Sequence, residues 1–431
     1  MRSDPISSGT WGNTVDDLLL LVHRMPYPPN KGDKIRSWHL LRHLATRYRV
    51  HLATFVDDRD DWQYVDHVRK LCASSHFAPL NPRMARLRSL RALLANRSLS
   101  LDYYSDRGLR RWVRDTMAKG TIDRIVAFSS PMAQYAREYP DARRIVDLCD
   151  VDSEKWRQYA QQKSWPASWV YGWEARRLLA YERKVAGASD AALFVSQPEA
   201  RLFARLAPES AGRVGWYGNG VDTAYFSPDA IYPDPYAVGE RAIVFCGAMD
   251  YWPNVDAAQW FARAVLPAVL ARQPAARFVI VGARPTPEVL ALALLPGVIV
   301  TGTVPDVRPY VAHAALSVAP LRVARGIQNK VLEAMAMART VVLTPQALEG
   351  IDAVPGRDVV VAQDAVSFAA AVCTQMAAPT AIGAAARRLV EDAYGWDARL
   401  SALDALLEAP TMPHAAPAAV PAPVLSGWTQ A

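Results

Sequence analysis

Residues 317–344, SVAPLRVARGIQNKVLEAMAMARTVVLT, constrain the fold of this chain more than any other stretch. Their pattern predicts a buried strand running into Pro320, a polar loop at 322–329, an apolar helix from about Lys330, and an apolar strand at 340–344. Strand, loop, helix and strand in this order form the unit of a parallel α/β sheet, and ligands bind where such strands end. We therefore expect a ligand site at this loop and helix start.

The charged residues of this helix stand out because nearly all of their neighbours are apolar. With Asn329 as the N-cap, Glu333 would lie in the first turn, where the helix dipole favours a carboxylate, so a purely structural role is one interpretation. Lys330 has no such explanation, because a cation at a helix N-terminus opposes the dipole. Its position favours an anion such as a phosphate at that helix end.

Residues 326–336 and the strand after them resemble the donor-site signature of retaining family-4 glycosyltransferases of GT-B fold. That signature is a Glu, seven residues, a second Glu and then Ala-Met-Ala. Glu333 matches the second Glu, which in the family holds the ribose hydroxyls of a nucleotide-sugar, whereas Arg325 stands where the first Glu would be. The variant ARGIQNKVLEAMA resembles the sugar transferases associated with bacterial PEP-CTERM/exosortase exopolysaccharide loci. The resemblance extends from about Leu18 to Glu408.

The resemblance implies two Rossmann-like α/β domains facing across a cleft, with a C-terminal helix that crosses back to the first domain. Alternation of strands and helices in both halves of the chain also favours two such domains. The predicted parts are an acceptor-side domain at 16–222, a linker at 223–240, a nucleotide-sugar-binding domain at 241–393, a crossing helix at 394–409, and disordered tails at 1–15 and 410–431.

The predicted donor site lies in the second domain. Gly247 follows its first strand, and the family usually carries an Arg and a Lys after this glycine to hold the diphosphate. Residues 249–254 read MDYWPN instead, so the phosphate charge must be met by residues near Lys330 in the motif. Gly302 begins a segment that matches the base-contacting loop of the family. The predicted donor-binding residues are Gly247, Asn254, Gly302, Arg322, Arg325, Gly326, Asn329, Lys330 and Glu333.

The predicted acceptor side lies in the first domain. The loop at 24–33, RMPYPPNKGD, follows the first strand, and its glycine lets the backbone approach a ligand, although an ordinary turn explains it equally well. The pair Asp150 and Asp152 invites a metal, but no His or Glu is clustered beside it, so we expect acceptor binding and no metal. The predicted acceptor-side residues are Gly32, Asp33, Lys34, Ser129, Asp150 and Asp152.

Residues 83–94, RMARLRSLRALL, predict a basic amphipathic helix with its leucines on one face. Such a helix either lies on an anionic membrane or packs its apolar face on the domain core. The net charge of +7 favours an anionic partner, and a lipid surface suits it better than nucleic acid. With no membrane-length apolar run, no signal peptide and four dispersed cysteines, we expect a cytoplasmic protein, peripheral on the inner face of the plasma membrane.

These patterns together predict a retaining, hexosyltransferase-type glycosyltransferase. It would move a sugar from a nucleotide-diphosphate donor to a glycan or polyprenyl-linked acceptor in bacterial exopolysaccharide biosynthesis. The resemblance implies no metal and no cofactor, because the nucleotide-sugar is a substrate. A nucleotide-sugar epimerase of the same architecture and a non-catalytic sugar-binding protein are the alternatives.

Overall fold

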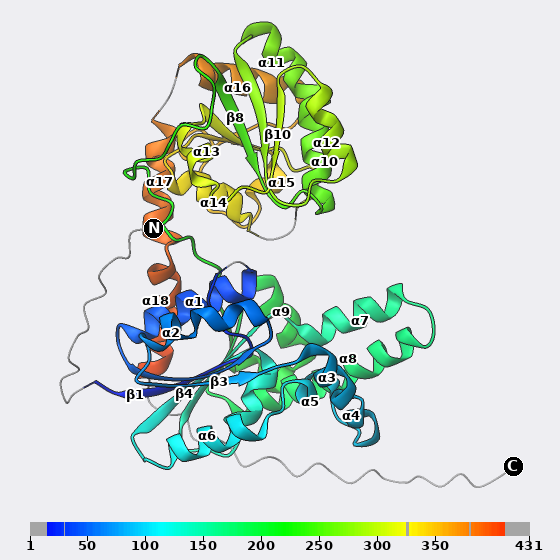
Figure 1. The fold of residues 1–431 in the computed structure, drawn as a ribbon, viewed down its shortest axis with the longest axis vertical. Helices are drawn as coiled ribbons and strands as arrows, with labels where there is room; N and C mark the ends of the chain where they lie inside the picture. Colours follow the sequence, from blue (N-terminus) through cyan, green and yellow to red (C-terminus); the bar gives the residue numbers. More distant parts are fainter. Residues whose placement is uncertain (1–14, 30, 325–326, 379–380, 410–431) are drawn as a thin grey trace, which may run out of the picture. The chain divides into compact units, whose positions relative to one another are not determined.

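A computed structural model describes residues 15–29, 31–324, 327–378 and 381–409, without the side chains of Leu94 and Gln162. The chain forms two compact units (Figure 1). The N-terminal unit comprises Met1–Gly218 with Ala402–Ala431, and the C-terminal unit comprises Asn219–Ser401. The predicted disordered tails lie outside the described residues, except for residue 15.

The strands of the N-terminal unit form one parallel sheet in the order β3-β2-β1-β4-β5-β6-β7. They are β1 (Asp17–Val22), β2 (Arg49–Val56), β3 (Ser74–Pro79), β4 (Ile122–Phe128), β5 (Arg143–Cys149), β6 (Ala191–Phe194) and β7 (Val214–Trp216). The order reverses between β1 and β4. In open parallel sheets, ligands bind beyond the carboxyl ends of the strands at such a reversal.

Helices cover both faces of this sheet, which is why its central strands are almost wholly apolar (Figure 1). The helices are α1 (Gly32–Ala45), α2 (Val65–Arg69), α3 (Pro82–Ser89), α4 (Arg91–Leu94), α5 (Leu99–Tyr103), α6 (Arg107–Met117), α7 (Asp152–Gln162), α8 (Ala167–Ala188) and α9 (Gln197–Leu206). Three short 3₁₀ segments are η1 (Arg59–Tyr64), η2 (Ser130–Tyr135) and η3 (Pro208–Arg213).

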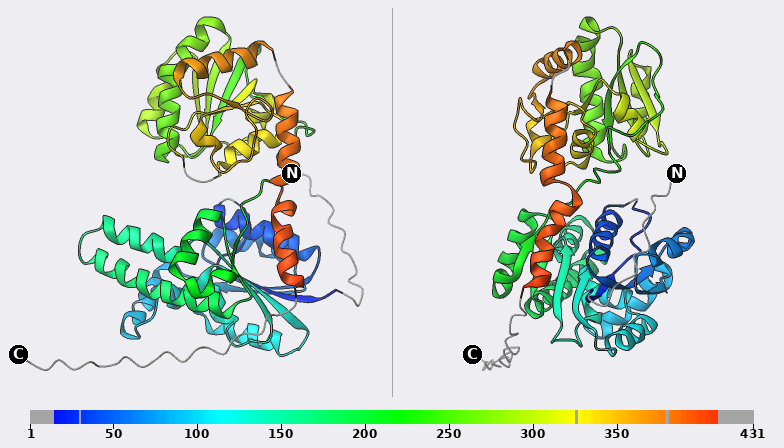
Figure 2. Two further views of the ribbon diagram at one scale, coloured as in Figure 1. Left: turned by 180° about the vertical axis from the view of Figure 1, so that it is seen from behind. Right: turned by 90° about the vertical axis from the view of Figure 1, so that its left-hand side faces the viewer.

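The C-terminal unit repeats this design with the strand order β10-β9-β8-β11-β12-β13, again all parallel (Figure 2). Its strands are β8 (Arg241–Cys246), β9 (Ala276–Val281), β10 (Val298–Gly302), β11 (Leu316–Ala319), β12 (Val341–Leu343) and β13 (Val360–Val361). The order reverses between β8 and β11. The strand, loop, helix and strand predicted from residues 317–344 are therefore β11, the loop, α14 (Asn329–Ala336) and β12, as expected.

The other helices of the C-terminal unit lie on the two faces of its sheet. They are α10 (Trp252–Trp260), α11 (Leu266–Arg272), α12 (Pro287–Leu290), α13 (Arg308–His313), α15 (Pro345–Leu348), α16 (Ala365–Ala377) and α17 (Ile382–Ala393), with a π-helical turn η4 (Phe261–Val265) and a 3₁₀ turn η5 (Ala291–Leu294).

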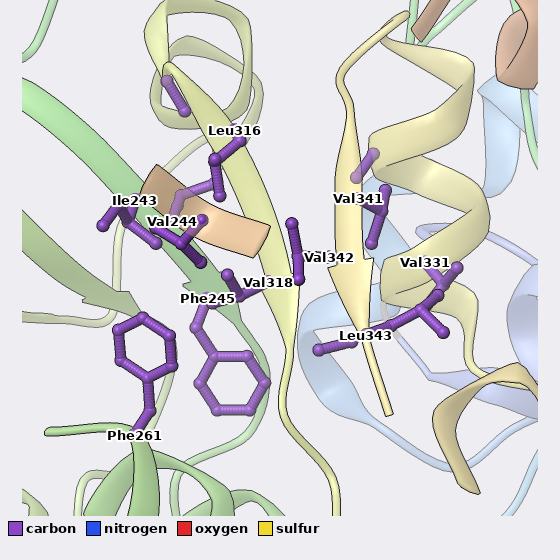
Figure 3. Packing of buried hydrophobic residues seen from close by; sticks show 14 of the residues in the cluster. Ile243, Val244, Phe245, Phe261, Leu316, Val318, Val331, Val341, Val342 and Leu343 are labelled. Atoms are coloured by element: carbon purple, nitrogen blue, oxygen red, sulfur yellow. The ribbon is translucent and has the colours of Figure 1, made fainter. Parts of the chain in front are cut away.

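The core of the C-terminal unit fixes α14 against the strands (Figure 3). Val331 on α14 lies beside Leu343 on β12, and both side chains are fully buried. Phe245 on β8 and Phe261 belong to the same buried cluster and lie on the side of β11 that is away from β12. The helix that carries Lys330 and Glu333 is therefore held by its apolar face, which leaves its polar side chains free for other contacts.

A buried charged network lies within the N-terminal unit. Arg36 on α1 donates from Nε to Asp147 Oδ2 over 2.9 Å and from a terminal nitrogen to the Tyr217 carbonyl over 3.1 Å. The Tyr217 hydroxyl donates to the same Asp147 carboxylate, and the Arg36 guanidinium stacks 3.7 Å from the Tyr217 ring centroid. These bonds tie the first helix, β5 and the end of the N-terminal unit into one block.

The helix α18 (Trp396–Glu408) links the two units covalently, since its residues from Ala402 onward belong to the N-terminal unit. In that part of α18, Asp404 Oδ1 lies 2.8 Å from Nε2 of His43 on α1. In the described part of the chain no single helix is long and apolar enough to cross a membrane. The bent pair α16 and α17 reaches that length only together, and both helices contribute side chains to the core.

Candidate functional site: the glycine edge and the Lys330–Glu333 helix

Three adjacent strands of the C-terminal unit end at glycines. Gly247 and Gly282 directly follow β8 and β9, and Gly302 ends β10. The Gly247 amide donates to the Val281 carbonyl over 3.0 Å, and the Gly282 amide donates to the Gly302 carbonyl over 3.1 Å. A Cβ at position 282 would lie 1.6 Å from the Gly247 carbonyl oxygen, so only glycine fits there. The edge therefore offers a ligand bare backbone, as a phosphate-binding surface does.

Lys330 reaches from α14 to this edge. Its ammonium donates to Asn254 Oδ1 over 2.5 Å and lies 4.6 Å from the centroid of the Phe245 ring. A Cβ on Gly247 would come within 2.9 Å of the ammonium and 2.7 Å of the Asn254 amide nitrogen. Burial lowers the pKa of Lys330 to about 8, because desolvation disfavours the charged ammonium. A bound anion would favour the charged form again.

Glu333 lies one turn further along the same face of α14. Its carboxylate is half-buried and makes no hydrogen bond or ion pair with any of the described residues. Burial raises the pKa of Glu333 to about 7, and the charge of Lys330 opposes that rise only in part. Glu333 lines a narrow pocket with Lys330, Cys246 and Ser317, among others. The Ser317 hydroxyl is buried and also lacks a hydrogen-bond partner among the residues that the structure describes.

The start of α14 differs from the prediction. The N-cap is Gln328, with no capping bond from its side chain, and Asn329 is already the first helical residue. Glu333 is therefore the fifth residue of the helix and lies beyond its first turn. Because the helix dipole acts mainly within the first turn, the purely structural explanation of Glu333 loses its basis.

The other predicted donor residues differ in whether they lie beside Lys330. Asn254 is buried on α10 beside Lys330 and donates to the Ala248 carbonyl over 2.8 Å. Arg322 is half-exposed and paired with Asp256 on α10, so its charge is already compensated within the unit. Arg325 and Gly326 lie outside the described residues.

The carboxyl end of the N-terminal sheet carries charges that are mostly paired. Lys34 is buried in an ion pair with Asp61, with 2.6 Å between Nζ and Oδ2. Asp33 contacts Arg24 at 2.6 Å and His23 at 3.4 Å. Although burial opposes it, the contacts with His23 and Arg24 hold the pKa of Asp33 below its usual range.

Gly32 begins α1, and apart from its chain neighbours and the backbone of α1, no described atom lies within 4 Å of the position that a Cβ on it would take. Ser129 directly follows β4 with a left-handed φ of 77°, as expected of a tight turn that re-aims the chain at a sheet edge. Both residues therefore lie at or after the carboxyl ends of β1 and β4, where the strand order reverses.

Asp150 and Asp152 share one cation. Lys155 Nζ lies 2.7 Å from Asp150 and 3.1 Å from Asp152. Over the described ranges, no group of three or more His, Cys, Asp and Glu side chains is arranged to hold a metal ion. Both aspartates lie beyond the end of β5, at the edge where the sequence predicts acceptor binding.

Several residues of both edges were not predicted from the sequence. His23 and Arg24 directly follow β1, and Arg24 also binds Asp57 after β2 at 2.8 Å. In the C-terminal unit, Gly282 and Ser317 were not predicted. A polar residue or glycine directly after an apolar run was the available signal in the first three cases, whereas Ser317 lies inside its strand.

Comparison with known proteins places this geometry in context. Residues 240–377, which hold the glycine edge, Lys330 and Glu333, match the family model described as "Glycosyl transferases group 1". No curated protein matches the chain.

Solved structures resemble the fold over most of the chain. HepE from Anabaena in complex with UDP is 13% identical with a TM-score of 0.59, covering 91% of this chain and 99% of that one. Sucrose-phosphate synthase from Thermosynechococcus elongatus is 16% identical with a TM-score of 0.59, covering 91% and 98%. An α,α-trehalose-phosphate synthase (UDP-forming) from Burkholderia vietnamiensis is 15% identical with a TM-score of 0.57, covering 91% and 99%. The fold is thus the GT-B pair of Rossmann-like domains, as predicted.

Proposed function

We propose that this protein is a glycosyltransferase that takes its sugar from a nucleotide-diphosphate donor. One observation carries the proposal. At the strand reversal of the C-terminal unit, the half-buried Glu333 carboxylate has no partner among the described residues. It lines the same pocket as Lys330, whose ammonium contacts the Asn254 amide oxygen and the Phe245 ring. The Glu333 carboxylate and the Lys330 ammonium are partly desolvated and form no ion pair with each other. They therefore suit a ligand with both hydroxyl and phosphate groups.

The chemistry follows from these groups. The Glu333 carboxylate accepts hydrogen bonds from the ribose hydroxyls, and the Lys330 ammonium stabilises the diphosphate as it leaves the sugar. The glycine edge admits the phosphates because no side chain covers it. We also propose that the reaction uses no protein nucleophile and no metal, and that the sugar keeps its anomeric configuration. This proposal rests on the resemblance and on the pairing of Asp150 and Asp152 with Lys155.

We propose a glycan or polyprenyl-linked acceptor, in bacterial exopolysaccharide synthesis. The reversal of strand order in the N-terminal unit supports an acceptor site there, because such reversals bind ligands in open parallel sheets. The match of residues 324–336 to the exopolysaccharide subgroup supports the pathway. Anabaena HepE has been solved in complex with UDP and with UDP-glucose, so these are the first donor ligands to test.

Calorimetric titration of the full chain with UDP, UDP-glucose and then other nucleotide-sugars tests the donor site. We expect one of them to bind to wild type and more weakly to Glu333→Gln. Glu288→Gln, which removes an exposed carboxylate on α12 of the same unit, serves as the matched control. No binding across the panel, or equal affinity for wild type and Glu333→Gln, would overturn the proposal. Release of free nucleoside diphosphate in the presence of a glycan acceptor distinguishes a transferase from an epimerase and from a binding protein.

A further inference from the structure

The basic segment of the N-terminal unit turns its large apolar side chains outward. The single helix predicted for residues 83–94 is broken at Leu90 into α3 and α4. Met84 and Leu87 are each 62% exposed and Leu90 is 51% exposed, whereas the inward positions hold small side chains. The inward residues are Ala85, Ser89 and Ala92. The interpretation in which the leucine face packs on the domain core therefore fails for these side chains.

The charges on this surface are unpaired and of one sign. Arg83, Arg86 and Arg91 are exposed and form no hydrogen bond or ion pair with any residue that the structure describes. Arg88 differs, because it donates to the carbonyl oxygens of the last two residues of α5, at 3.3 and 3.0 Å. No acidic residue occurs between Pro82 and Leu101. Asp102 on the neighbouring α5 is already paired with Arg97, so these arginines can attract anions.

The segment is held firmly in this orientation. Glu174 on α8 is fully buried, and its carboxylate caps the start of α5. It accepts from the Ser98 hydroxyl at 2.7 Å, the Leu99 amide at 2.6 Å, and the Ser100 amide and hydroxyl at 3.1 and 2.7 Å. Because α3 packs on α5, these bonds fix which side of α3 faces solvent.

A second apolar feature projects from the same unit. The hairpin of α7 and α8 exposes Tyr159 by 49%, Trp165 by 80% and Trp169 by 53%. Figures 1 and 2 show the hairpin tip and α4 extending from the same side of the N-terminal unit. Exposed tryptophans at a helix tip suit the boundary between lipid headgroups and acyl chains.

We propose that α3, α4 and the tip of the α7–α8 hairpin form a docking surface for an anionic membrane. Charge decides between this partner and a second copy of the chain. A two-fold contact would bring the same uncompensated arginines of two copies together, which is unfavourable, whereas acidic lipid headgroups neutralise them. The large apolar side chains that lie between those arginines can then enter the headgroup region of the membrane, which needs no complementary protein surface.

Co-sedimentation of the full chain with phosphatidylcholine vesicles, with and without phosphatidylglycerol, tests the basic part of the surface. We expect binding only to the anionic vesicles at low salt, and release at high salt, because exposed charges are screened. The triple variant Arg83→Gln, Arg86→Gln, Arg91→Gln should bind on the order of 100-fold more weakly, at about fivefold per arginine. Arg88 is kept because it holds α5.

A matched control removes the same net charge elsewhere in the N-terminal unit. Arg111, Arg201 and Arg205 are exposed on α6 and α9, and their triple Gln variant should bind vesicles as wild type does. An equal loss in both triple variants would show attraction by net charge alone and overturn the docking surface. So would a wild-type protein that ignores anionic vesicles at low salt.

The aromatic part is tested by Trp165→Ser with Trp169→Ser, which should weaken vesicle binding at least tenfold. Trp62→Ser with Trp216→Ser, which changes two other exposed tryptophans of this unit, should not. If the hairpin variant leaves vesicle binding unchanged but converts an oligomeric wild type into a monomer by light scattering, the hairpin is a protein interface and the proposal is wrong. These measurements contain no donor, so their outcome is independent of the proposed transferase activity.

Discussion

Replacing Glu333 with Gln should weaken donor binding and at the same time stabilise the fold. Gln keeps the size of the side chain and its acceptor oxygen but cannot ionise. Bonds from two ribose hydroxyls to a carboxylate contribute ~1.5–3 kcal/mol each, against ~0.5–1.5 kcal/mol for a neutral acceptor. The expected loss is about 2–3 kcal/mol, which is roughly 30- to 150-fold in dissociation constant.

The gain in stability follows from the partial burial of this carboxyl. Its pKa rises from an ordinary 4.5 to about 7 in the folded chain. The protonated carboxyl therefore contributes stability that is fully present below pH 4.5 and is lost as the pH rises through 7. A rise of that size corresponds to at most roughly 3 kcal/mol, and because the carboxyl is only half-buried, Glu333→Gln should recover a part of this at pH 8.

Urea unfolding of wild type and Glu333→Gln at pH 4 and pH 8, with calorimetric donor titration at pH 8, measures both effects. We expect the variant to be more stable at pH 8, equal at pH 4, and weaker in donor binding. A variant that is less stable at pH 8 and binds donor normally would show that Glu333 supports the helix and not a ligand. Glu288→Gln should leave donor binding unchanged.

Gly247, the pair Asp150 and Asp152, and Tyr217 can each be tested by one variant or treatment. Gly247→Ala should lower donor affinity at least tenfold in calorimetry, because its Cβ would crowd the Lys330 ammonium at 2.9 Å; unchanged affinity would place the donor elsewhere. Turnover should persist in EDTA, because Asp150 and Asp152 already share a lysine; loss in EDTA and recovery with manganese would restore their metal interpretation. Tyr217→Phe should lower the unfolding free energy by about 1–3 kcal/mol in urea, since it removes a buried bond to a carboxylate; no change would mean that the network does not depend on this hydroxyl.

The fold could be predicted because its signals are local and repeated. Apolar runs of strand length alternate with helical patterns in both halves, and this alternation alone favours parallel sheets. The strand order, with its reversals after β1 and β8, cannot be read from composition, but the resemblance implied it. Gly247 and Gly302 were predicted correctly as strand-end residues, since glycine directly follows or ends an apolar run.

The faces and partners of surface elements could not be predicted. Residues 83–94 have a periodicity that places leucines on one face, yet the buried carboxylate of Glu174, about 80 residues away, holds α5 so that small side chains face inward. Likewise, nothing near Arg322 in the sequence indicates that Asp256 neutralises it. Long-range pairing decides both cases, and a single sequence carries no signal for it.

The two strand reversals differ in how their charges are satisfied, and this difference bears on which substrate each unit holds. In the N-terminal unit, Lys34 is paired with Asp61, and Arg24 is shared between two aspartates. In the C-terminal unit, Lys330 and Glu333 have pKa values drawn toward neutrality and form no ion pair with each other. An edge with satisfied charges suits the uncharged hydroxyls of an acceptor, whereas an edge with an unsatisfied cation beside bare backbone suits a diphosphate. The charge state of each edge is therefore a further argument for the proposed donor site in the C-terminal unit and the proposed acceptor site in the N-terminal unit.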